Sequence, residues 1–372
     1  MRFLGELKNL DFFLLLIILC IQSFGLLAIY SATYNGGVSS LFYKHLIYII
    51  LGWVIILILS YEKFENFLDI SLYIYLFNLL LLIAVFLYGK EIYGAKRWIS
   101  LGFLNIQPSE FMKFSLILVS AYILPFIKGI KDRRWTLIIL LYAIPAMVTL
   151  KQPDLGTTVA YSVPLVYMLI ARGVPLRYFV LAGFLFISFI PIAWNYLLKP
   201  YQKKRILAVI DPFSDYYGSG YQLIQSKIAI GSGMLTGKGL LGGTQTHLLF
   251  LPEKHTDFIF AVIGEELGFV GTFILSTLFL ILLLRLIYYH EIFCRLSEKI
   301  FVAGVFSLIL FQFTVNTLMT MGLFPVVGIP LPFVSLGGSS MLSFSIMIGI
   351  LQNIYKKYKN SYLNLDKEPL YE

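Results

Sequence analysis

About ten long apolar stretches, separated by short polar ones, are the feature of this sequence that most constrains its fold. A helix needs about 20 mostly apolar residues to cross the hydrocarbon core of a membrane, and each stretch comes near that length. The chain is 59% hydrophobic and only 13% charged over 372 residues, which is more apolar surface than a soluble domain can bury. The predicted spans are residues 12–31, 45–61, 69–88, 110–127, 135–150, 157–171, 177–198, 257–288, 300–321 and 338–355.

An all-α, polytopic membrane protein, a bundle of about ten transmembrane helices, is therefore the predicted fold. A closed β-barrel is the other structure that can span a membrane, but it needs short segments of alternating polarity. Runs such as "LLLLIAVFLYG" do not alternate. We predict one membrane domain over residues 1–372, with a large extracytoplasmic loop at 199–256 and a short cytoplasmic tail at 356–372.

The distribution of lysine and arginine predicts the orientation. Basic residues in short loops tend to stay cytoplasmic, and most of those in this chain lie on the side of its N-terminus. Both termini are therefore predicted to be cytoplasmic. The first span has no small-residue cleavage site after a short apolar core, so we expect it to be a retained helix and not a signal peptide.

The remaining composition excludes other classes. Cys20 lies in a span and Cys294 in an inner loop, so they cannot form a disulfide framework. The net charge of +9 is explained by the basic residues that set the membrane topology. The sequence contains no helix-turn-helix, zinc-binding or RNA-binding pattern. The sequence therefore predicts no nucleic-acid partner.

The polar residues gather in three outer segments, at 89–113, 151–157 and 199–256. A structureless loop as long as the third is uncommon unless it is functional. Its piece "YQLIQSKIAIGSG" alternates apolar and polar residues and is expected to form a helix along the membrane interface. The glycine-rich run that follows allows close approach to a ligand, but a flexible loop without a site is an equal alternative.

Charged residues beside or within spans mark candidate sites because they are costly in lipid. Glu110 and Lys113 are three apart on one helix and are predicted to pair; Ser109 is the predicted cap of that helix. Asp154 is expected to cap the helix that follows it. Lys96 and Arg97 suit either an anchor at the interface or contacts to a lipid phosphate.

The stretch "LPEKHTDFIFAVIGEELGFVG" carries the most charge at the edge of a span. The residues from 267 to 284 are uncharged, which puts Glu265 and Glu266 near the outer hydrocarbon boundary. Asp257 lies eight residues further out, roughly 12 Å along a helix. Thr256 or Asp257 is the predicted N-cap, and Asp257 would then share a helix face with Glu265.

A carboxylate just outside the lipid, with cations nearby, suits inverting transfer of a sugar from a lipid-linked sugar diphosphate. The diphosphate leaves as an anion and needs charge neutralisation, so one base suffices. Sugar hydrolysis requires two flanking carboxylates instead. Transport of such a lipid is the alternative function at this point.

Four runs of residues resemble the SEDS family (shape, elongation, division and sporulation). They are "KRWISLGFLNIQPSEFMK", "KQPDLGT", the stretch from "KRILAVIDPFSD" to "IGEELGFVG", and "MGLFPVVGIPLPFVSLGGSS". The resemblance covers essentially the whole membrane domain. It implies ten transmembrane helices and a peptidoglycan glycosyltransferase that polymerises lipid II outside the cytoplasmic membrane of a bacterium. "GTQTHLLFLPEKHTDFIF" and "IQSKIAIGSG" resemble the elongation branch more than the division branch.

The resemblance also implies roles for single residues. Asp257 falls on the family's catalytic aspartate, which activates the 4-hydroxyl of the acceptor sugar, and Glu110 and Lys113 fall on a pair that orients or balances it. A divalent cation, Mg²⁺ or Mn²⁺, is expected to bridge the diphosphate, with no metal ligands identified. The candidate substrate-binding residues are Lys96, Arg97, Asp154, Arg205, Gln225, Lys238, Gln245, Glu253, His255 and Thr256.

Polymerisation alone leaves the glycan uncrosslinked, and the chain contains no transpeptidase domain. The resemblance therefore implies a class B penicillin-binding protein and other elongation-complex proteins as partners, besides lipid II and the nascent lipid-linked glycan. A lipid II flippase and the polymerase of cell division are the alternative functions. A flippase would need ionisable groups deep in several spans, whereas most charges here lie at the outer boundary.

Overall fold

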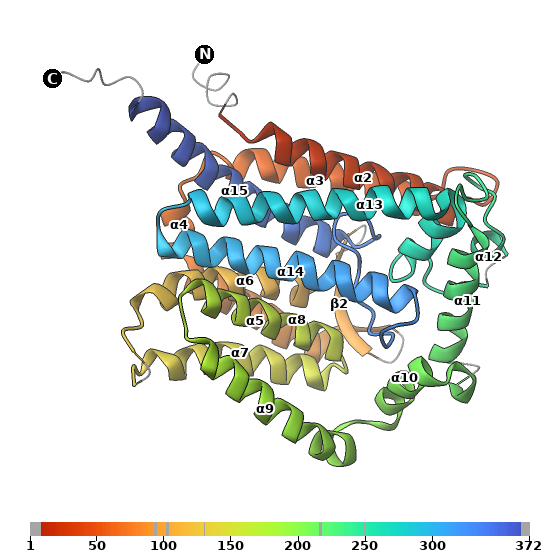
Figure 1. The fold of residues 1–372 in the computed structure, drawn as a ribbon, viewed down its shortest axis with the longest axis horizontal. Coiled ribbons are helices and arrows are strands. Elements are labelled where there is room, and N and C mark those ends of the chain that lie inside the picture. The colour runs from red at the N-terminus through yellow and green to blue at the C-terminus, as the bar shows by residue number, and fades with distance from the viewer. Residues whose placement is uncertain are drawn as a thin grey trace.

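A bundle of long helices makes up the protein. The computed structural model describes residues 9–92, 95–101, 104–129, 131–215, 218–248 and 250–365. Every predicted span coincides with a helix, and most of these helices run side by side along the long axis of the molecule (Figure 1). These helices are α2 Phe12–Thr33, α3 Ser40–Leu59, α5 Ser71–Tyr88, α6 Pro108–Ile123, α7 Arg134–Lys151, α8 Leu155–Ala171, α9 Leu176–Ile192, α13 Ile259–Ile292, α14 Leu296–Thr320 and α15 Gly338–Leu365.

Hydropathy supports the membrane assignment. Eight of the described helices are long and apolar enough to cross a membrane, counting α6 and α9 with the short turns that extend them. The shorter α8 is apolar over its 17 residues. Helix α15 continues through the start of the predicted tail to Leu365, and residues 366–372 lie outside the described part of the chain. The chain is thus a multi-pass, all-α membrane protein.

Helices α6 and α14 form the centre of the bundle, since most of their residues are buried. A side chain at Gly304 of α14 would place its Cβ 2.7 Å from Ile117 of α6 and 3.0 Å from the sulfur of Met168 of α8. The glycine therefore allows the three helices to approach closely. Helix α9 lies at the periphery and buries none of its residues, so its apolar side chains are left to face lipid (Figure 1).

Short elements connect the spans. The segment before α6 folds as an antiparallel sheet in the order β1-β2-β3, with Ile99 paired to Ile106. The connecting elements are β1 Lys90–Ile92, β2 Ala95–Leu101, β3 Leu104–Ile106, α4 Phe64–Asp69, η1 Leu124–Phe126 and η2 Ala193–Leu197.

The start of α6 differs from the prediction. Its N-cap is Gln107, and Ser109 is a buried residue inside the first turn. Pro108 occupies the first helical position, where its fixed φ fits the helix and its missing N–H is not needed. The proline therefore sets the boundary two residues before the predicted cap.

The segment 199–256 is largely helical and does not form a long structureless loop. It contains α10 Pro200–Ile210, η3 Pro212–Asp215, α11 Ser219–Ser232 and α12 Thr244–His247. The predicted helix is α11, but it packs on protein and does not lie free along the interface. Ser226 of α11 donates a hydrogen bond to the carbonyl of Thr320 at the end of α14 (2.6 Å), and a Cβ at Gly233 would lie 1.9 Å from the carbonyl of Gly264 in α13.

Helix α13 begins at Ile259 after Phe258, which offers no side-chain cap. The prediction of Thr256 or Asp257 as cap is therefore wrong, and Asp257 shares no helix face with Glu265. Gly268 interrupts the helix with φ 64° and ψ −159°, values that few L side chains adopt. A kink at Gly268 thus separates the first part of α13, which carries Glu265 and Glu266, from the rest of the helix.

Replacing Gly268 is expected to destabilise the protein. A Cβ at Gly268 would lie 2.3 Å from the nitrogen of Gly237 and 2.6 Å from the carbonyl of Leu235. The positive φ alone costs an alanine about 1–3 kcal/mol. We therefore expect Gly268→Ala to lower the midpoint of thermal unfolding in detergent, followed by tryptophan fluorescence.

Gly183→Ala is the matched control, because a Cβ at Gly183 in α9 meets nothing within 4 Å. This substitution should leave the midpoint unchanged or raise it slightly, since alanine favours a helix by about 0.5–1 kcal/mol over glycine. Equal midpoints for the two variants would refute the role of the kink.

Candidate active site

Asp257 lies in a turn segment, residues 251–258, directly before the start of α13. Its side chain is partly exposed and, among the described residues, makes no hydrogen bond or ion pair. A Cβ on Gly328 would lie 3.3 Å from Asp257 Oδ2. The carboxylate therefore lies against the loop that joins α14 to α15, where Gly328, at φ 70°, leaves it room.

The environment raises the pKa of Asp257 to about 7 from its usual 3.8. Burial is the main cause, and the charges of Glu253 and Asp154 add to it, whereas Arg205 and Arg97 lower the pKa. A carboxylate that titrates near neutral pH is suited to accept a proton as a general base. The fold thus brings these four charged residues close enough to Asp257 to change its pKa.

Arg97 and Asp154 form one unit beside Asp257. Arg97 donates to the carbonyl oxygens of Gln152 (3.0 Å) and Pro153 (2.5 Å), and lies 3.5 Å from the Asp154 carboxylate. Asp154 also accepts from the backbone N–H of Thr157 (3.1 Å), which confirms it as the N-cap of α8. Arg97 therefore holds β2 against the start of α8.

Arg205 and Lys96 are the more accessible cations. Arg205 is exposed on α10, donates to the carbonyl of Val326 (3.1 Å), and lies 5.8 Å from the ring centre of Tyr201. Lys96 is exposed on β2. Arg205 acts on Asp257 through its charge, and both cations stay predicted contacts for an anionic group.

Glu110 and Lys113 form the predicted ion pair. Lys113 Nζ lies 2.6 Å from Glu110 Oε1, and both residues are buried in α6. Ser343 of α15 donates to the carbonyl of Glu110 (3.0 Å). The structure describes no hydrogen bond or ion pair between this pair and Asp257. Since losing one member of a buried pair leaves an uncompensated charge, each residue requires the other.

The residues flanking Asp257 are held within their own turn. Thr256 Oγ1 donates to the carboxylate of Glu253 (3.1 Å), and Glu253 has a positive φ of 48°. Burial lowers the pKa of His255, which favours its neutral form. Gln225 lies partly exposed on α11, outside these contacts.

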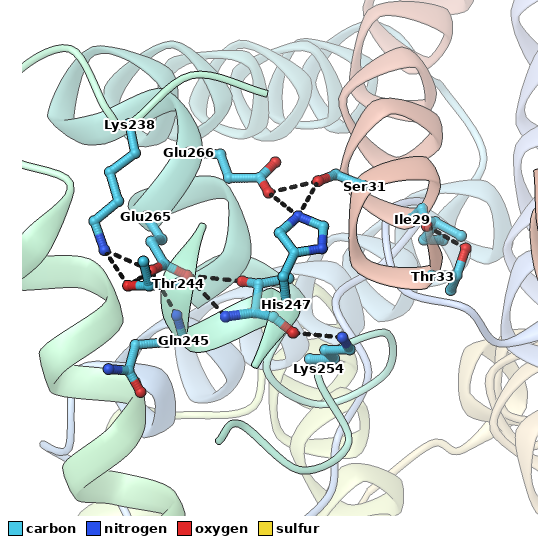
Figure 2. A network of polar contacts seen from close by, with 11 residues as sticks. Ile29, Ser31, Thr33, Lys238, Thr244, Gln245, His247, Lys254, Glu265 and Glu266 are labelled. Carbon is cyan, nitrogen blue, oxygen red and sulfur yellow. Dashed lines mark hydrogen bonds and ion pairs between the residues drawn. The ribbon is translucent and has the colours of Figure 1, made fainter. Parts of the chain in front are cut away.

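Lys238 and the backbone of Gln245 contact Glu265, as Figure 2 shows. Lys238 Nζ lies 2.7 Å from Glu265 Oε1, and the backbone N–H of Gln245 donates to the same oxygen (2.9 Å). The backbone N–H and hydroxyl of Thr246 donate to Oε2 (3.0 and 2.8 Å). Lys238 and Gln245 as substrate contacts stay a prediction; the structure shows that Lys238 and the backbone of Gln245 also support the loop.

Glu266 connects the same loop to the first span (Figure 2). Its Oε1 accepts from the hydroxyl of Ser31 in α2 (2.5 Å) and lies 3.3 Å from Nε2 of His247 in α12. Ser31 and His247 were not predicted as contacts from the sequence. Ser31 is a small polar residue near the end of an apolar span, and His247 is a histidine in a glycine-rich segment; these are the signals that could have indicated them.

Metal binding has no preformed site among the described residues. No group of three or more His, Cys, Asp or Glu side chains lies close enough together there to hold an ion. Mg²⁺ often binds through one or two carboxylates and the phosphates of a substrate.

Comparisons with known proteins agree with this geometry. The model of the cell cycle protein family FtsW/RodA/SpoVE matches residues 10–360. The peptidoglycan glycosyltransferase MrdB of Escherichia coli K12 is 36% identical over 352 residues, covering 94% of this chain and 95% of MrdB. Relatives named FtsW are also among the similar proteins.

Two solved structures share the fold. A chain from a study of how a peptidoglycan synthase complex coordinates polymerization and crosslinking superposes with a TM-score of 0.79 and 30% identity, covering 94% of this chain and 98% of that one. The rod shape determining protein RodA of Thermus thermophilus gives a TM-score of 0.70 and 26% identity, covering 94% and 97%. The chain therefore belongs to the FtsW/RodA/SpoVE family of cell cycle proteins, the SEDS family that its motifs predicted.

Proposed function

We propose that this protein is a peptidoglycan glycosyltransferase that polymerises lipid II at the outer face of the bacterial cytoplasmic membrane. The observation that carries the proposal is Asp257, a carboxylate without a hydrogen-bonding partner among the described residues and with a pKa near 7. The match to MrdB over nearly the whole of both chains supports the same activity.

In the proposed reaction, Asp257 takes the proton from the 4-hydroxyl of the acceptor sugar. The freed oxygen attacks the anomeric carbon of the donor, and the bond from that carbon to the diphosphate oxygen breaks with inversion. Undecaprenyl diphosphate leaves as an anion, so it needs neutralising charge and no proton donor. We assign the supply of that charge to the exposed cations Arg205 and Lys96.

A divalent cation remains part of the proposal as a companion of the substrate diphosphate. It would add positive charge to the leaving group when bound. No step of the proposed reaction is assigned to it, because the described residues do not form a metal site.

The proposal includes an orientation, a branch of the family and a partner. Both termini lie in the cytoplasm, which puts Asp257 outside. The match to a rod shape determining protein and the motifs around "LPEKHTDF" favour a role in cell elongation over division. The match to a chain from a peptidoglycan synthase complex supports a crosslinking partner, which we assign to the class B penicillin-binding proteins.

A lipid II flippase is the alternative activity, and the buried Glu110–Lys113 pair within α6 is the observation that keeps it in view. Vesicles containing labelled lipid II distinguish the two activities. Appearance of the label on the other leaflet without glycan polymer would support transport and overturn the polymerase.

Asp257→Asn is expected to abolish polymerisation. The amide has a similar shape but cannot accept the proton, and loss of a general base typically lowers a rate about 10²–10⁴-fold. Glycan strands formed from lipid II by the purified protein with its partner, separated on gels, measure this. Unchanged unfolding midpoint and partner binding control for folding, and strand formation at the wild-type rate would rule out Asp257 as the base.

The polymerase is expected to lose activity below neutral pH. The base must be deprotonated, and its pKa is about 7, so kcat/KM should rise with pH through that value and reach a plateau above it. At one pH unit below the pKa, about a tenth of the plateau should remain. An acid limb centred near the ordinary aspartate value of 3.8 would contradict the assignment.

Arg205→Gln is expected to move the acid limb to higher pH and to raise KM. The positive charge of Arg205 lowers the pKa of Asp257, so its removal lets that pKa rise. The same substitution removes a cation from the front of the site. Lys238→Met is the control: it should lower stability, because it leaves buried Glu265 without its cation. If the two substitutions changed KM equally, Arg205 would not differ from Lys238 in its contribution to substrate binding.

A further inference from the structure

The backbone carbonyls of residues 255–257 all accept hydrogen bonds from α14 or from the segment between α14 and α15. The carbonyl of His255 accepts from the backbone N–H of Leu336 (2.9 Å), and that of Thr256 accepts from Ser335 Oγ (2.7 Å). The carbonyl of Asp257 accepts from Asn316 Nδ2 (2.9 Å). The turn before α13 is thus held at residues 255–257 by the end of α14 and the loop that follows.

Asn316 connects two segments with one side chain. Its Nδ2 donates both to the carbonyl of Asp257 and to that of Ile329 (2.8 Å), and the residue is fully buried in α14. Ser335 has a similar double role, because its hydroxyl donates to Thr256 and accepts from the backbone N–H of Leu331 (2.8 Å). Buried amide and hydroxyl groups used in this way hold a backbone in one position.

The clamped loop also determines what the carboxylate meets. Gly328 is the residue directly before Ile329 in this loop, and it lies against Asp257 Oδ2. The same side chain of Asn316 therefore fixes the backbone of the loop at Ile329 and that of Asp257. A shift of either backbone would change the depth of the carboxylate in the site.

We propose that Asn316 is a positioning residue for Asp257, and that it acts together with Ser335 to hold the carboxylate in its enclosed place. Neither residue touches the carboxylate, so neither is a catalytic residue. This inference rests on the proposed function for its kinetic consequence, but the position of the carboxylate is measurable without turnover.

A loosened clamp should have a specific electrostatic result. The charged and titratable groups that act on Asp257 are Glu253, Asp154, Arg205 and Arg97, and burial outweighs all four. If the turn moves outward, water reaches the carboxylate and its pKa falls towards 3.8. A general loss of stability would lower the amount of folded protein but would not move this titration.

The test compares Asn316→Leu with Asn353→Leu. Asn353 is the matched control, because its buried amide also connects two backbone groups, donating to the carbonyl of Ser60 (3.2 Å) and accepting from Phe64 N–H (3.1 Å). Those groups lie between α3 and α4, at the other end of the bundle (Figure 1). A water-soluble carbodiimide modifies protonated carboxyl groups, and peptide mass spectrometry follows its reaction at Asp257 across pH.

The wild type and Asn353→Leu should give a labelling midpoint near pH 7. For Asn316→Leu we expect the midpoint to fall by about one unit or more. In the polymerisation assay, the acid limb of kcat/KM should move the same way, and kcat should fall about 100-fold with a smaller change in KM. An unmoved midpoint in Asn316→Leu would overturn the inference, whether or not the protein polymerises lipid II.

Ser335 provides a second pair of variants in case Asn316→Leu fails to fold. Ser335→Thr keeps the hydroxyl, whereas Ser335→Ala removes it and leaves the carbonyl of Thr256 unpaired. The alanine variant should show the same downward shift of the labelling midpoint, and the threonine variant should restore the wild-type value. Identical midpoints for the two variants would count against the clamp.

Discussion

The enclosure of two adjacent carboxylates, Glu265 and Glu266, is the constraint on which the arrangement of the glycine-rich loop, α2 and α13 depends. An ion buried without partners costs several kcal/mol, so the chain must bring donors to both. Glu265 is satisfied by Lys238 and the start of α12, and Glu266 by Ser31 and His247. The two carboxylates therefore have separate tasks: one fixes the glycine-rich loop on α13, and the other ties it to α2.

The contrast with Asp257 separates a structural carboxylate from a reactive one. Glu265 accepts several hydrogen bonds and an ion pair, which hold it as an anion with no capacity left for substrate. Asp257 is only partly buried, but its carboxylate receives no such donors among the described residues, so its charge is poorly compensated. Burial without compensation is what raises a pKa into the range useful for a base. The fold thus provides donors to the backbone of Asp257 and leaves its carboxylate open.

The spans, the Glu110–Lys113 pair and the cap at Asp154 could be predicted because local rules determine them: hydropathy over about 20 residues, and spacings of three or four along a helix. The wrong caps at Ser109 and Asp257 arose where a proline and a turn shifted a helix start by about two residues. The contact between Lys238 and Glu265 was not predicted, because the two residues lie 27 apart in the sequence. Asn316 gave no signal at all, since a single polar residue in an apolar span does not reveal which backbone it will meet.

The turn before α13 must be held in place, but the carboxylate of Asp257 must stay free of donors, as it does among the described residues. These two demands fall on the same few residues and oppose each other. Every donor aimed at the turn stabilises it, but a donor that reached the carboxylate would lower its pKa and weaken it as a base. Backbone carbonyls resolve the conflict, because donors bound to them fix the chain while adding no charge next to the carboxylate. Asn316 and Ser335 are neutral side chains, as this argument requires. A lysine or arginine in their place would pair with the carboxylate itself, and the site would become more stable but less reactive.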